Sequence, residues 1–299
     1  MSSAKFTIES LAGIKGFDER LNGLTDRHDV YPAIDPQAAF SSKSFTGKVV
    51  LITGASRGLG QVMATFYARA GAKLALVARS ASNLDALKKQ IQKESDVEIL
   101  TFVLDVKDTQ AAAKAVQDTV DHFGKIDIVI PNAGISTGPT FLGDRDIAHW
   151  WNTLEVNLLG TLNFVGPALK HLEKTNGYVI AISSRAAQAR IPGASDYGIS
   201  KLALSRLVEF IALEYKTVSV FSVHPGAVWT DMGKDSGAPK ELFAETPELA
   251  AATVLALASG KYDWLSGRFV DATQDLGELE QLKEQILGKD ALVSKLALV

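Results

Sequence analysis

A glycine-rich loop between an expected strand and an expected helix constrains this chain more than any other feature. The run Thr53-Gly54-Ala55-Ser56-Arg57-Gly58-Leu59-Gly60 follows an apolar stretch over 48–52 and precedes a helical pattern. Because glycine has no Cβ, the backbone can turn sharply here and bring its free amides and a helix N-terminus to a phosphate group. The run predicts a nucleotide site, although a glycine cluster after a strand also occurs in ordinary tight turns.

The pattern downstream of this loop predicts the fold class. Short runs rich in Val, Ile, Leu and Phe alternate with helical patterns, which is typical of parallel strands joined by crossover helices on both faces of a sheet. A chain of 299 residues with 46% hydrophobic content can bury one sizeable core. We predict a single doubly wound α/β (Rossmann) domain with strands near 48–53, 73–79, 98–104, 126–131, 177–183, 217–223 and 267–271, and helices near 59–70, 82–94, 109–123, 146–173, 195–215 and 247–258.

Composition excludes several classes of function. The chain has no cysteine, so disulfides, thiolate nucleophiles and cysteine metal clusters are excluded, and its five histidines lack ligand-like spacing, so we expect no metal. A net charge of −3 gives no long-range attraction for nucleic acid or anionic membranes. The longest apolar runs fall well short of the roughly 20 residues that span a bilayer. We therefore expect a cytoplasmic protein with a small-molecule substrate and neither nucleic acid nor membrane as a partner.

Two segments flank the predicted domain. Residues 1–46 are acidic and lack a long apolar centre, unlike a targeting presequence, and Pro32 and Pro36 predict an irregular arm. A disordered tail is the alternative to an arm whose apolar residues attach to the body or to a neighbouring subunit; these are Leu21, Leu24, Val30 and Tyr31.

The segment 276–299 and the stretch after the sixth strand differ in character. Apolar residues in the tail recur at intervals of three and four, which predicts an amphipathic helix that docks on the body or on a partner subunit, with membrane contact as the alternative. Residues 231–247 hold glycines, prolines and charges, and we expect a mobile loop there. The spaced residues of the tail are Leu276, Leu279, Leu282, Ile286 and Leu287.

The end of the second strand indicates which cofactor the loop holds. About 20 residues after the glycines, a site for NAD usually offers a carboxylate to the ribose 2′-hydroxyl. Here the sequence is Val77-Ala78-Arg79-Ser80, and the guanidinium of Arg79 can clamp a 2′-phosphate together with Arg57. The pattern favours NADPH over NADH. The alternative, two solvated surface charges, is disfavoured because Arg57 lies inside the phosphate loop.

The strongest chemical signal is a serine, a tyrosine and a lysine. Ser184 ends a strand, Tyr197 follows thirteen residues later, and Lys201 lies one helical turn beyond Tyr197. A free phenol has a pKa near 10, and an adjacent ammonium is expected to lower it so that Tyr197 can act as a general acid or base. The serine hydroxyl can hold the substrate oxygen beside the phenol.

With these motifs in order, the chain closely resembles the short-chain dehydrogenase/reductase family over about 47–272. The resemblance implies one doubly wound domain over 47–275 with seven parallel strands, and a homodimer or homotetramer paired through the helices that carry Asn157 and Tyr197. The catalytic tetrad matches Asn157, Ser184, Tyr197 and Lys201, where Asn157 holds a water in a proton relay and Lys201 also binds the nicotinamide ribose. The residues expected at the cofactor are Gly54, Ser56, Arg57, Gly58, Leu59, Gly60, Arg79, Asp105, Val106, Asn132, Ala133, Gly134, Tyr197, Lys201, Pro225, Gly226, Val228 and Thr230.

Several other residues carry weaker expectations. We interpret His224 as structural, and Trp150 and Trp151 as packing residues or a subunit contact. Substrate-facing and packing roles are equally open for Trp229 and Met232. Three residues lie between the serine and the tyrosine, namely Arg185, Gln188 and Arg190. They either recognise an oxygen-rich or acidic substrate or are simply exposed to solvent, and both roles are open.

The leading hypothesis is an NADPH-dependent reductase of a ketone or aldehyde, reversible to an alcohol dehydrogenase. Hydride comes from nicotinamide C4 and the proton comes from Tyr197. One alternative keeps the fold but changes the chemistry to epimerisation, dehydration or a pericyclic step without net consumption of cofactor. Another is a cofactor-binding sensor or scaffold, against which the intact tetrad argues.

Overall fold

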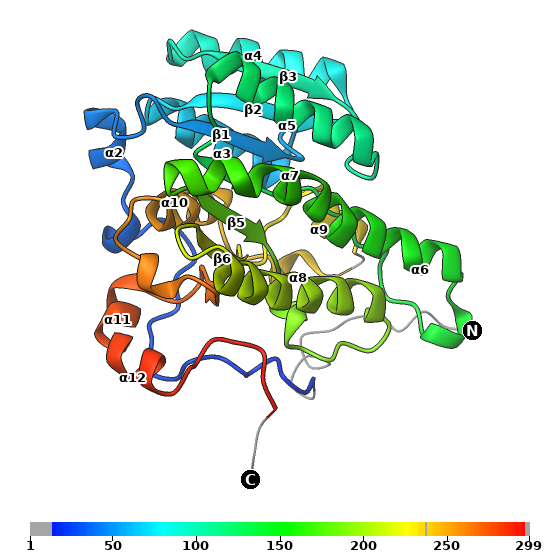
Figure 1. The fold of residues 1–299 in the computed structure, drawn as a ribbon. Helices are drawn as coiled ribbons and strands as arrows, with labels where there is room; N and C mark the ends of the chain where they lie inside the picture. The colour runs from blue at the N-terminus through cyan, green and yellow to red at the C-terminus, as the bar shows by residue number, and fades with distance from the viewer. Residues whose placement is uncertain (1–13, 237, 297–299) are drawn as a thin grey trace.

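The structure, a computed structural model, describes residues 14–236 and 238–296, and within them seven strands form one parallel sheet (Figure 1). The strand order is β3-β2-β1-β4-β5-β6-β7, so the winding direction reverses between β1 and β4. This is the doubly wound arrangement that the sequence predicts, and its switch point lies beside the glycine-rich loop. The strands are β1 Val49–Thr53, β2 Lys73–Ala78, β3 Ile99–Val103, β4 Ile128–Ile130, β5 Tyr178–Ile182, β6 Ser219–His224 and β7 Arg268–Asp271.

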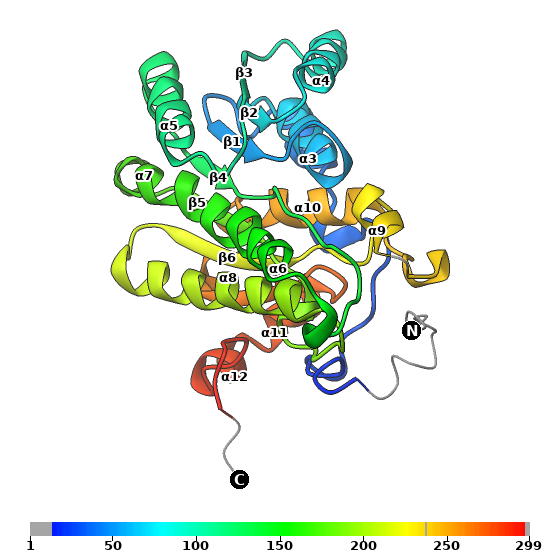
Figure 2. The same cartoon turned by 90° about the vertical axis from the view of Figure 1, so that its right-hand side faces the viewer.

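Helices cover both faces of the sheet. In Figure 2 the sheet is seen nearly edge-on, with α3, α4 and α10 on one side and α5, α7 and α8 on the other. The helices are α2 Gln37–Ser42, α3 Gly58–Arg69, α4 Ala81–Glu94, α5 Thr109–Phe123, α6 Ile147–Leu154, α7 Gly160–Thr175, α8 Ser195–Glu214, α9 Asp231–Asp235, α10 Pro247–Leu257, α11 Leu276–Gln281 and α12 Lys283–Gly288.

The sheet divides the core into two halves because successive strand side chains point to opposite faces. Ile52 of β1 packs in the half that contains Tyr67 of α3, whereas the preceding Leu51 packs in the half that contains Phe164 of α7. All five residues of β1 are buried, as expected for a strand covered on both faces. The apolar run over β1 is therefore a central strand of a three-layer domain.

The long helix predicted over 146–173 is interrupted. After α6 the chain makes a π-helical turn, Glu155–Leu159, before α7 begins. The hydroxyl of Thr161, in the first turn of α7, donates to the carbonyl of Asn157 in this π turn at 2.9 Å. A π turn takes one more residue per turn than an α-helix and is frequent at functional sites. The stretch 231–247, expected to be a loop, is also more regular than expected, since it begins with the short helix α9.

The described part of the N-terminal arm lies on the body of its own chain. Tyr31 is buried in the core, and Leu21, Leu24 and Val30 pack against the same cluster, whereas residues 1–13 lie outside the described residues. The C-terminal segment also docks there, as two short helices with Leu282 between them. Its Leu276, Leu279 and Ile286 are buried, while Leu287 stays exposed. Among the described helices, none is both long and apolar enough to cross a membrane.

Candidate active site

A cavity of about 660 Å³ opens at the carboxyl ends of the strands, around the switch point of the sheet. This volume lies within the range of about 300–1,000 Å³ that is typical of small-molecule sites. Of the residues expected at the cofactor or in the tetrad, Gly60 and Asn157 are not among those that line the cavity. All the others line it, and they come from the ends of β1 to β6 and from α8.

Glycines shape the loop after β1. Gly54 has φ of +64°, and a Cβ there would lie 2.9 Å from the Cα of Ala133. A Cβ on Gly60 would lie 2.3 Å from the carbonyl oxygen of Gly54, so this glycine allows α3 to pack beneath the loop. The amide of Asn132 fixes the same turn by donating to the carbonyls of Thr53 at 3.0 Å and Gly54 at 3.2 Å. The N-terminus of α3 thus borders a cradle that fits the pyrophosphate of a dinucleotide.

Positive charge lies at the end of the cavity next to β2. Arg79 and Arg57 are both exposed at its wall. Arg57 makes an ion pair with Asp231 of α9 at 2.9 Å, and Lys234 contacts the other carboxylate oxygen at 3.1 Å. Lys234 and Arg57 hold the pKa of Asp231 below its ordinary value. The sequence gives no sign of this contact because its partners are 174 positions apart.

Asp105 and Val106, which follow β3, form the wall beside Arg79. The carboxylate of Asp105 accepts from the backbone N–H of Lys107 at 3.0 Å. The carbonyl of Val106 accepts from the buried amide of Asn163 on α7 at 2.8 Å. These bonds fix the turn after β3, so both side chains face the cavity from a rigid support.

Ser184, Tyr197 and Lys201 meet in the cavity at the ends of β5 and α8. The hydroxyl of Ser184 accepts from the N–H of Ala186 at 3.1 Å. Lys201 lies one turn after Tyr197, with its Nζ 5.7 Å from the centre of the phenol ring. The Nζ donates to the carbonyl of Ile182 at 2.8 Å, which ties the lysine to the end of β5.

Burial dominates the electrostatics of this pair. It raises the pKa of Tyr197 above its ordinary value of 10.0, while a hydrogen bond with Ser184 acts in the opposite direction. Burial also lowers the pKa of Lys201 to about 8. The expectation of a pKa below 10 for the phenol is therefore wrong for this structure. Burial is the largest effect on the phenol, and the ammonium of Lys201, 5.7 Å from the ring centre, donates to the carbonyl of Ile182.

Asn157 lies behind the cavity, in the π-helical turn. Its side-chain oxygen accepts from the N–H of Ile135 at 2.8 Å, and its amide donates to the carbonyl of Ile135 at 3.0 Å. The amide also donates to Ser200 at 2.9 Å, and Ser200 in turn donates to the carbonyl of Tyr197 at 2.7 Å. Asn157 therefore links the loop after β4 to the helix that carries the tyrosine.

A buried ion pair next to Tyr197 escapes prediction from the sequence. Arg145 and Asp196 meet at 3.0 Å, with side chains only 4% and 2% exposed. The guanidinium also donates to the carbonyls of Gly138 at 2.6 Å and Gly193 at 2.8 Å. The second carboxylate oxygen of Asp196 accepts from the N–H of Tyr197 at 2.8 Å. One side chain thus joins the loop after β4, the loop before α8 and the first turn of α8.

Of the residues with weaker expectations, Met232 and His224 line the cavity, whereas Trp229 and Trp150 do not. Met232 lines the cavity together with Phe243, whereas Trp229 packs against Phe243 with ring centres 4.9 Å apart. His224 also lines the cavity, and burial lowers its pKa. Trp150 donates to Ser195 at 3.0 Å.

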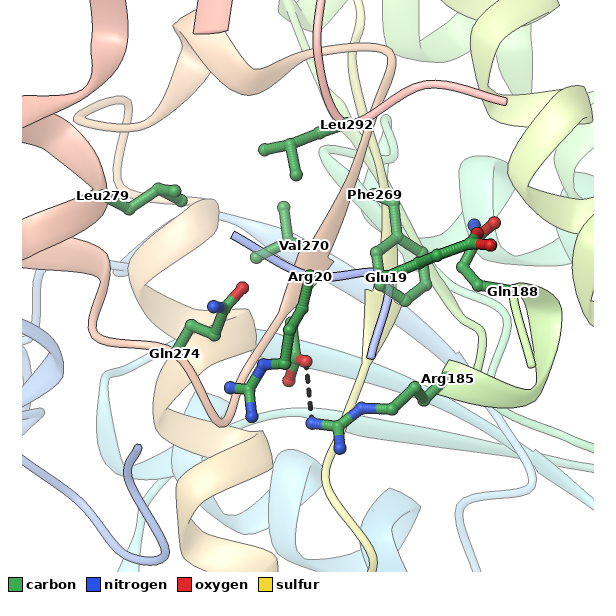
Figure 3. Close-up of a pocket in the computed structure, with 10 residues that line it drawn as sticks. Glu19, Arg20, Arg185, Gln188, Phe269, Val270, Gln274, Leu279 and Leu292 are labelled. Carbon is green, nitrogen blue, oxygen red and sulfur yellow. Dashed lines mark hydrogen bonds and ion pairs between the residues drawn. The ribbon is translucent and has the colours of Figure 1, made fainter. Parts of the chain in front are cut away.

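Arg185, Gln188 and Arg190, for which substrate recognition and simple exposure to solvent were both open, are not among the residues that line the cavity. Arg185 and Gln188 line a different, small pocket together with Glu19 and Arg20 of the arm (Figure 3). Arg185 makes an ion pair with Asp271 at 3.0 Å. These side chains therefore turn toward the arm instead of toward the cavity.

Comparison with known proteins agrees with this architecture. The family model for short chain dehydrogenase matches residues 48–241. A short chain dehydrogenase of Monascus purpureus is 39% identical over 287 residues, which cover 91% of this chain and 94% of the relative. The chain belongs to the short-chain dehydrogenase/reductase family, whose members use nicotinamide cofactors.

Solved structures show the same fold. The crystal structure of a levodione reductase superposes with a TM-score of 0.72 at 29% identity, covering 76% of this chain and 96% of the other. An alcohol dehydrogenase from the archaeon Thermococcus sibiricus, complexed with 5-hydroxy-NADP, has a TM-score of 0.66 at 32% identity and covers 70% of this chain and 89% of the other. The expected single doubly wound domain with seven parallel strands is confirmed, as is oxidoreductase family membership.

Proposed function

We propose that this chain is a cytoplasmic NADPH-dependent reductase of a ketone or aldehyde, able in reverse to oxidise the alcohol. One observation carries the proposal: Ser184, Tyr197 and Lys201 line the same cavity as the glycine-rich loop and Arg79. When bound, NADPH supplies the hydride to the carbonyl carbon. The residues around the cavity supply orientation, a proton and electrostatic stabilisation.

Tyr197 is the proton donor of this proposal. Because burial raises its pKa, the phenol is protonated at neutral pH and is suited to give its proton to the carbonyl oxygen. Ser184 holds that oxygen beside the phenol. Lys201, whose pKa of about 8 keeps most of its charge at pH 7, stabilises the phenolate left by proton transfer. It also binds the ribose hydroxyls, as the family resemblance implies.

Asn157 completes the proposed tetrad as a positioning residue. Its contacts with Ile135 and Ser200 hold the loop after β4 against α8. By family resemblance it also holds a water in the relay that resupplies the proton. Its burial behind the cavity supports a role through its neighbours over direct contact with substrate.

The preference for NADPH rests on charge at the ribose end of the cavity. The turn after β2 offers Arg79 where a carboxylate would select NAD, and Arg57 lies on the same wall. The remaining proposed cofactor contacts come from three turns, after β3, β4 and β6. They are Asp105 and Val106; Asn132, Ala133 and Gly134; and Pro225, Gly226, Val228 and Thr230. Gly60 acts indirectly, by letting α3 approach the loop.

We also propose that the chain pairs through α7 and α8. Large apolar side chains are exposed along these helices and the adjoining turn, and such a surface is typical of a subunit interface. The exposed residues are Leu159, Leu162, Ile199, Leu202, Phe210 and Leu213. A homodimer or homotetramer would cover them.

A stoichiometric assay tests the proposed activity. Reduction requires one NADPH oxidised for each alcohol formed, whereas an epimerase or dehydratase leaves the NADPH concentration unchanged at completion. NADPH is followed by its absorbance and product by mass spectrometry over a panel of ketones and aldehydes. Product formed without loss of NADPH contradicts the reductase assignment.

A further inference from the structure

The N-terminal arm lies outside the matched family region, yet it contacts the loop that joins Ser184 to the helix of Tyr197. We call residues 185–194 the Ser–Tyr loop and residues 15–29 the arm segment. The carbonyl of Lys15 accepts from the N–H of Arg190 at 2.8 Å. The next residue, Gly16, is buried so closely against the loop that a Cβ would lie 2.4 Å from the carbonyl oxygen of Gln188. The two backbones are in direct contact.

Side chains extend this contact to the residue that follows Ser184. The guanidinium of Arg185 lies 5.4 Å from the ring centre of Phe17 and donates to Thr273 at 3.0 Å. Arg20 of the arm segment reaches the same Thr273 hydroxyl at 3.4 Å. Figure 3 shows Arg20 and Arg185 side by side beneath Val270 of β7. Arg185 is therefore held between the arm and the end of β7.

The arm segment also supports the loop after β6, residues 225–230, which we call the β6 loop. His28 contacts the carboxylate of Glu245 at 2.9 Å, and its carbonyl accepts from the N–H of Thr246 at 2.9 Å. The other oxygen of Glu245 accepts from the N–H of Ala227 at 2.7 Å. Gly226 packs so tightly on Glu245 that a Cβ would lie 2.8 Å from it. The β6 loop thus rests on a carboxylate that the arm holds in place.

The arm has a firm base from which to hold these loops. Arg27 makes an ion pair with Asp275 at 2.7 Å, and the carboxylate of Asp275 is only 8% exposed. Just beyond the segment, the buried Tyr31 donates to the carbonyl of Gln274 at 3.2 Å and accepts from the N–H of Leu276 at 2.9 Å. These contacts anchor the arm on the body of the protein. The arm can therefore limit the movement of both loops.

We propose that the arm segment is a positioning element for the reaction. It holds Ser184 at the correct distance from Tyr197 through the Ser–Tyr loop, and it holds the β6 loop against the bound nicotinamide through His28 and Glu245. The first half of this proposal rests on the proposed reductase function, and the second requires only cofactor binding. Each of the two contacts has a partner in the arm, which lies outside the matched family region.

Two glycines of the arm provide a matched pair of variants. Gly16 and Gly23 both have φ of +81°, so alanine costs the same backbone strain at either position. A Cβ on Gly23 meets nothing within 4 Å, whereas one on Gly16 must move away from Gln188 by at least about 0.6 Å to reach the 3.0 Å that real contacts respect. Gly16→Ala therefore forces the arm and the Ser–Tyr loop apart, and Gly23→Ala is the control.

The full-length variants are compared by three measurements. These are amide hydrogen exchange in the Ser–Tyr loop, the Kd for NADPH, and the single-turnover rate of NADPH oxidation by phenanthrenequinone at saturating concentrations. Since a misplacement of about 1 Å can cost about 100-fold in rate, we expect Gly16→Ala to slow turnover about tenfold relative to Gly23→Ala. Exchange in the loop should be faster, while the Kd for NADPH and the melting temperature match those of Gly23→Ala. Equal turnover and equal exchange in the two variants would overturn the proposal.

A second pair of variants tests the β6 loop and remains informative if Gly16→Ala does not fold. His28→Ala removes one partner of Glu245, and the control His122→Ala breaks another exposed His–Glu pair, with Glu98 at 2.6 Å beside β3. We expect His28→Ala to raise the Kd for NADPH several-fold and to speed exchange at 225–230. If the two variants have the same Kd and the same exchange, the support from the arm is refuted. A wild-type protein that binds NADPH but leaves the quinone unreduced contradicts the reductase function, while exchange and Kd still decide on the arm.

Discussion

Replacing Lys201 with methionine tests how far burial lowers the pKa of this lysine and the stability of the protein. Lys201 is 3% exposed, and burial lowers its pKa from the ordinary 10.5 to about 8. A difference of this size between the unfolded and folded states corresponds to about 3 kcal/mol. The ammonium therefore lowers the stability of the wild-type protein at neutral pH, and methionine fills the same space without the charge.

The sign of the pH dependence follows from proton binding. Below about pH 8 the lysine is charged in both states, and above 10.5 it is neutral in both. Between these values the unfolded chain binds more protons, so the stability of the wild type rises with pH. Lys201→Met lacks this titration. The free energy of unfolding of the wild type minus that of the variant should therefore rise by about 2–3 kcal/mol from pH 7 to pH 10.

Urea denaturation followed by tryptophan fluorescence at the two pH values measures this difference. Lys114→Met is the control, because the side chain of Lys114 is 72% exposed and its replacement should change stability little at either pH. Lys201→Met should also lose reductase activity while remaining at least as stable as the wild type at pH 7. A difference that stays constant between pH 7 and pH 10, or that falls, would refute the reasoning.

Three further predictions concern the cofactor, the cavity walls and assembly. Arg79→Ala should weaken NADPH binding about tenfold and leave NADH binding unchanged, as measured by fluorescence titration; a wild type that prefers NADH contradicts the assignment. Arg145→Ala leaves the buried carboxylate of Asp196 without its partner and should lower the free energy of unfolding by about 3–5 kcal/mol. Arg206→Ala, at a more exposed pair, should lower it by less than about 1 kcal/mol. Equal losses would show that burial of the first pair is unimportant. Phe210→Glu, on the exposed face of α8, should convert a dimer or tetramer to smaller species in light scattering, and an unchanged mass would exclude this interface.

Features that depend on local pattern could be predicted from the sequence. The strands appear as buried apolar runs, and the glycine loop and the turn between Tyr197 and Lys201 depend on residues close together in the chain. The doubly wound class followed because parallel strands joined by helices have few alternative arrangements. These local patterns were sufficient to predict that Ser184, Tyr197 and Lys201 share one site.

Features that depend on distant partners could not be predicted. The pair Arg57–Asp231 joins residues 174 positions apart, and the pair Arg27–Asp275, which holds the arm on the body, joins residues 248 positions apart. The hydrophobic pattern of the sequence does not reveal the π turn that carries Asn157. This turn adds only one residue to a single turn of an otherwise α-helical stretch. Likewise, the direction in which Arg185 points depends on Asp271 of β7, which the sequence between Ser184 and Tyr197 does not reveal.

The most direct test of the central claim is transfer of deuterium by the wild type and by Tyr197→Phe from NADPH that carries deuterium at both C4 positions of the nicotinamide. The proposed mechanism predicts that the wild type places one deuterium on the carbinol carbon for each NADPH consumed. The variant, which keeps the ring but loses the acidic hydroxyl, should bind NADPH with the affinity of the wild type and form almost no labelled alcohol. Labelled alcohol formed by Tyr197→Phe at a rate near that of the wild type would contradict the assignment of Tyr197 as the proton donor.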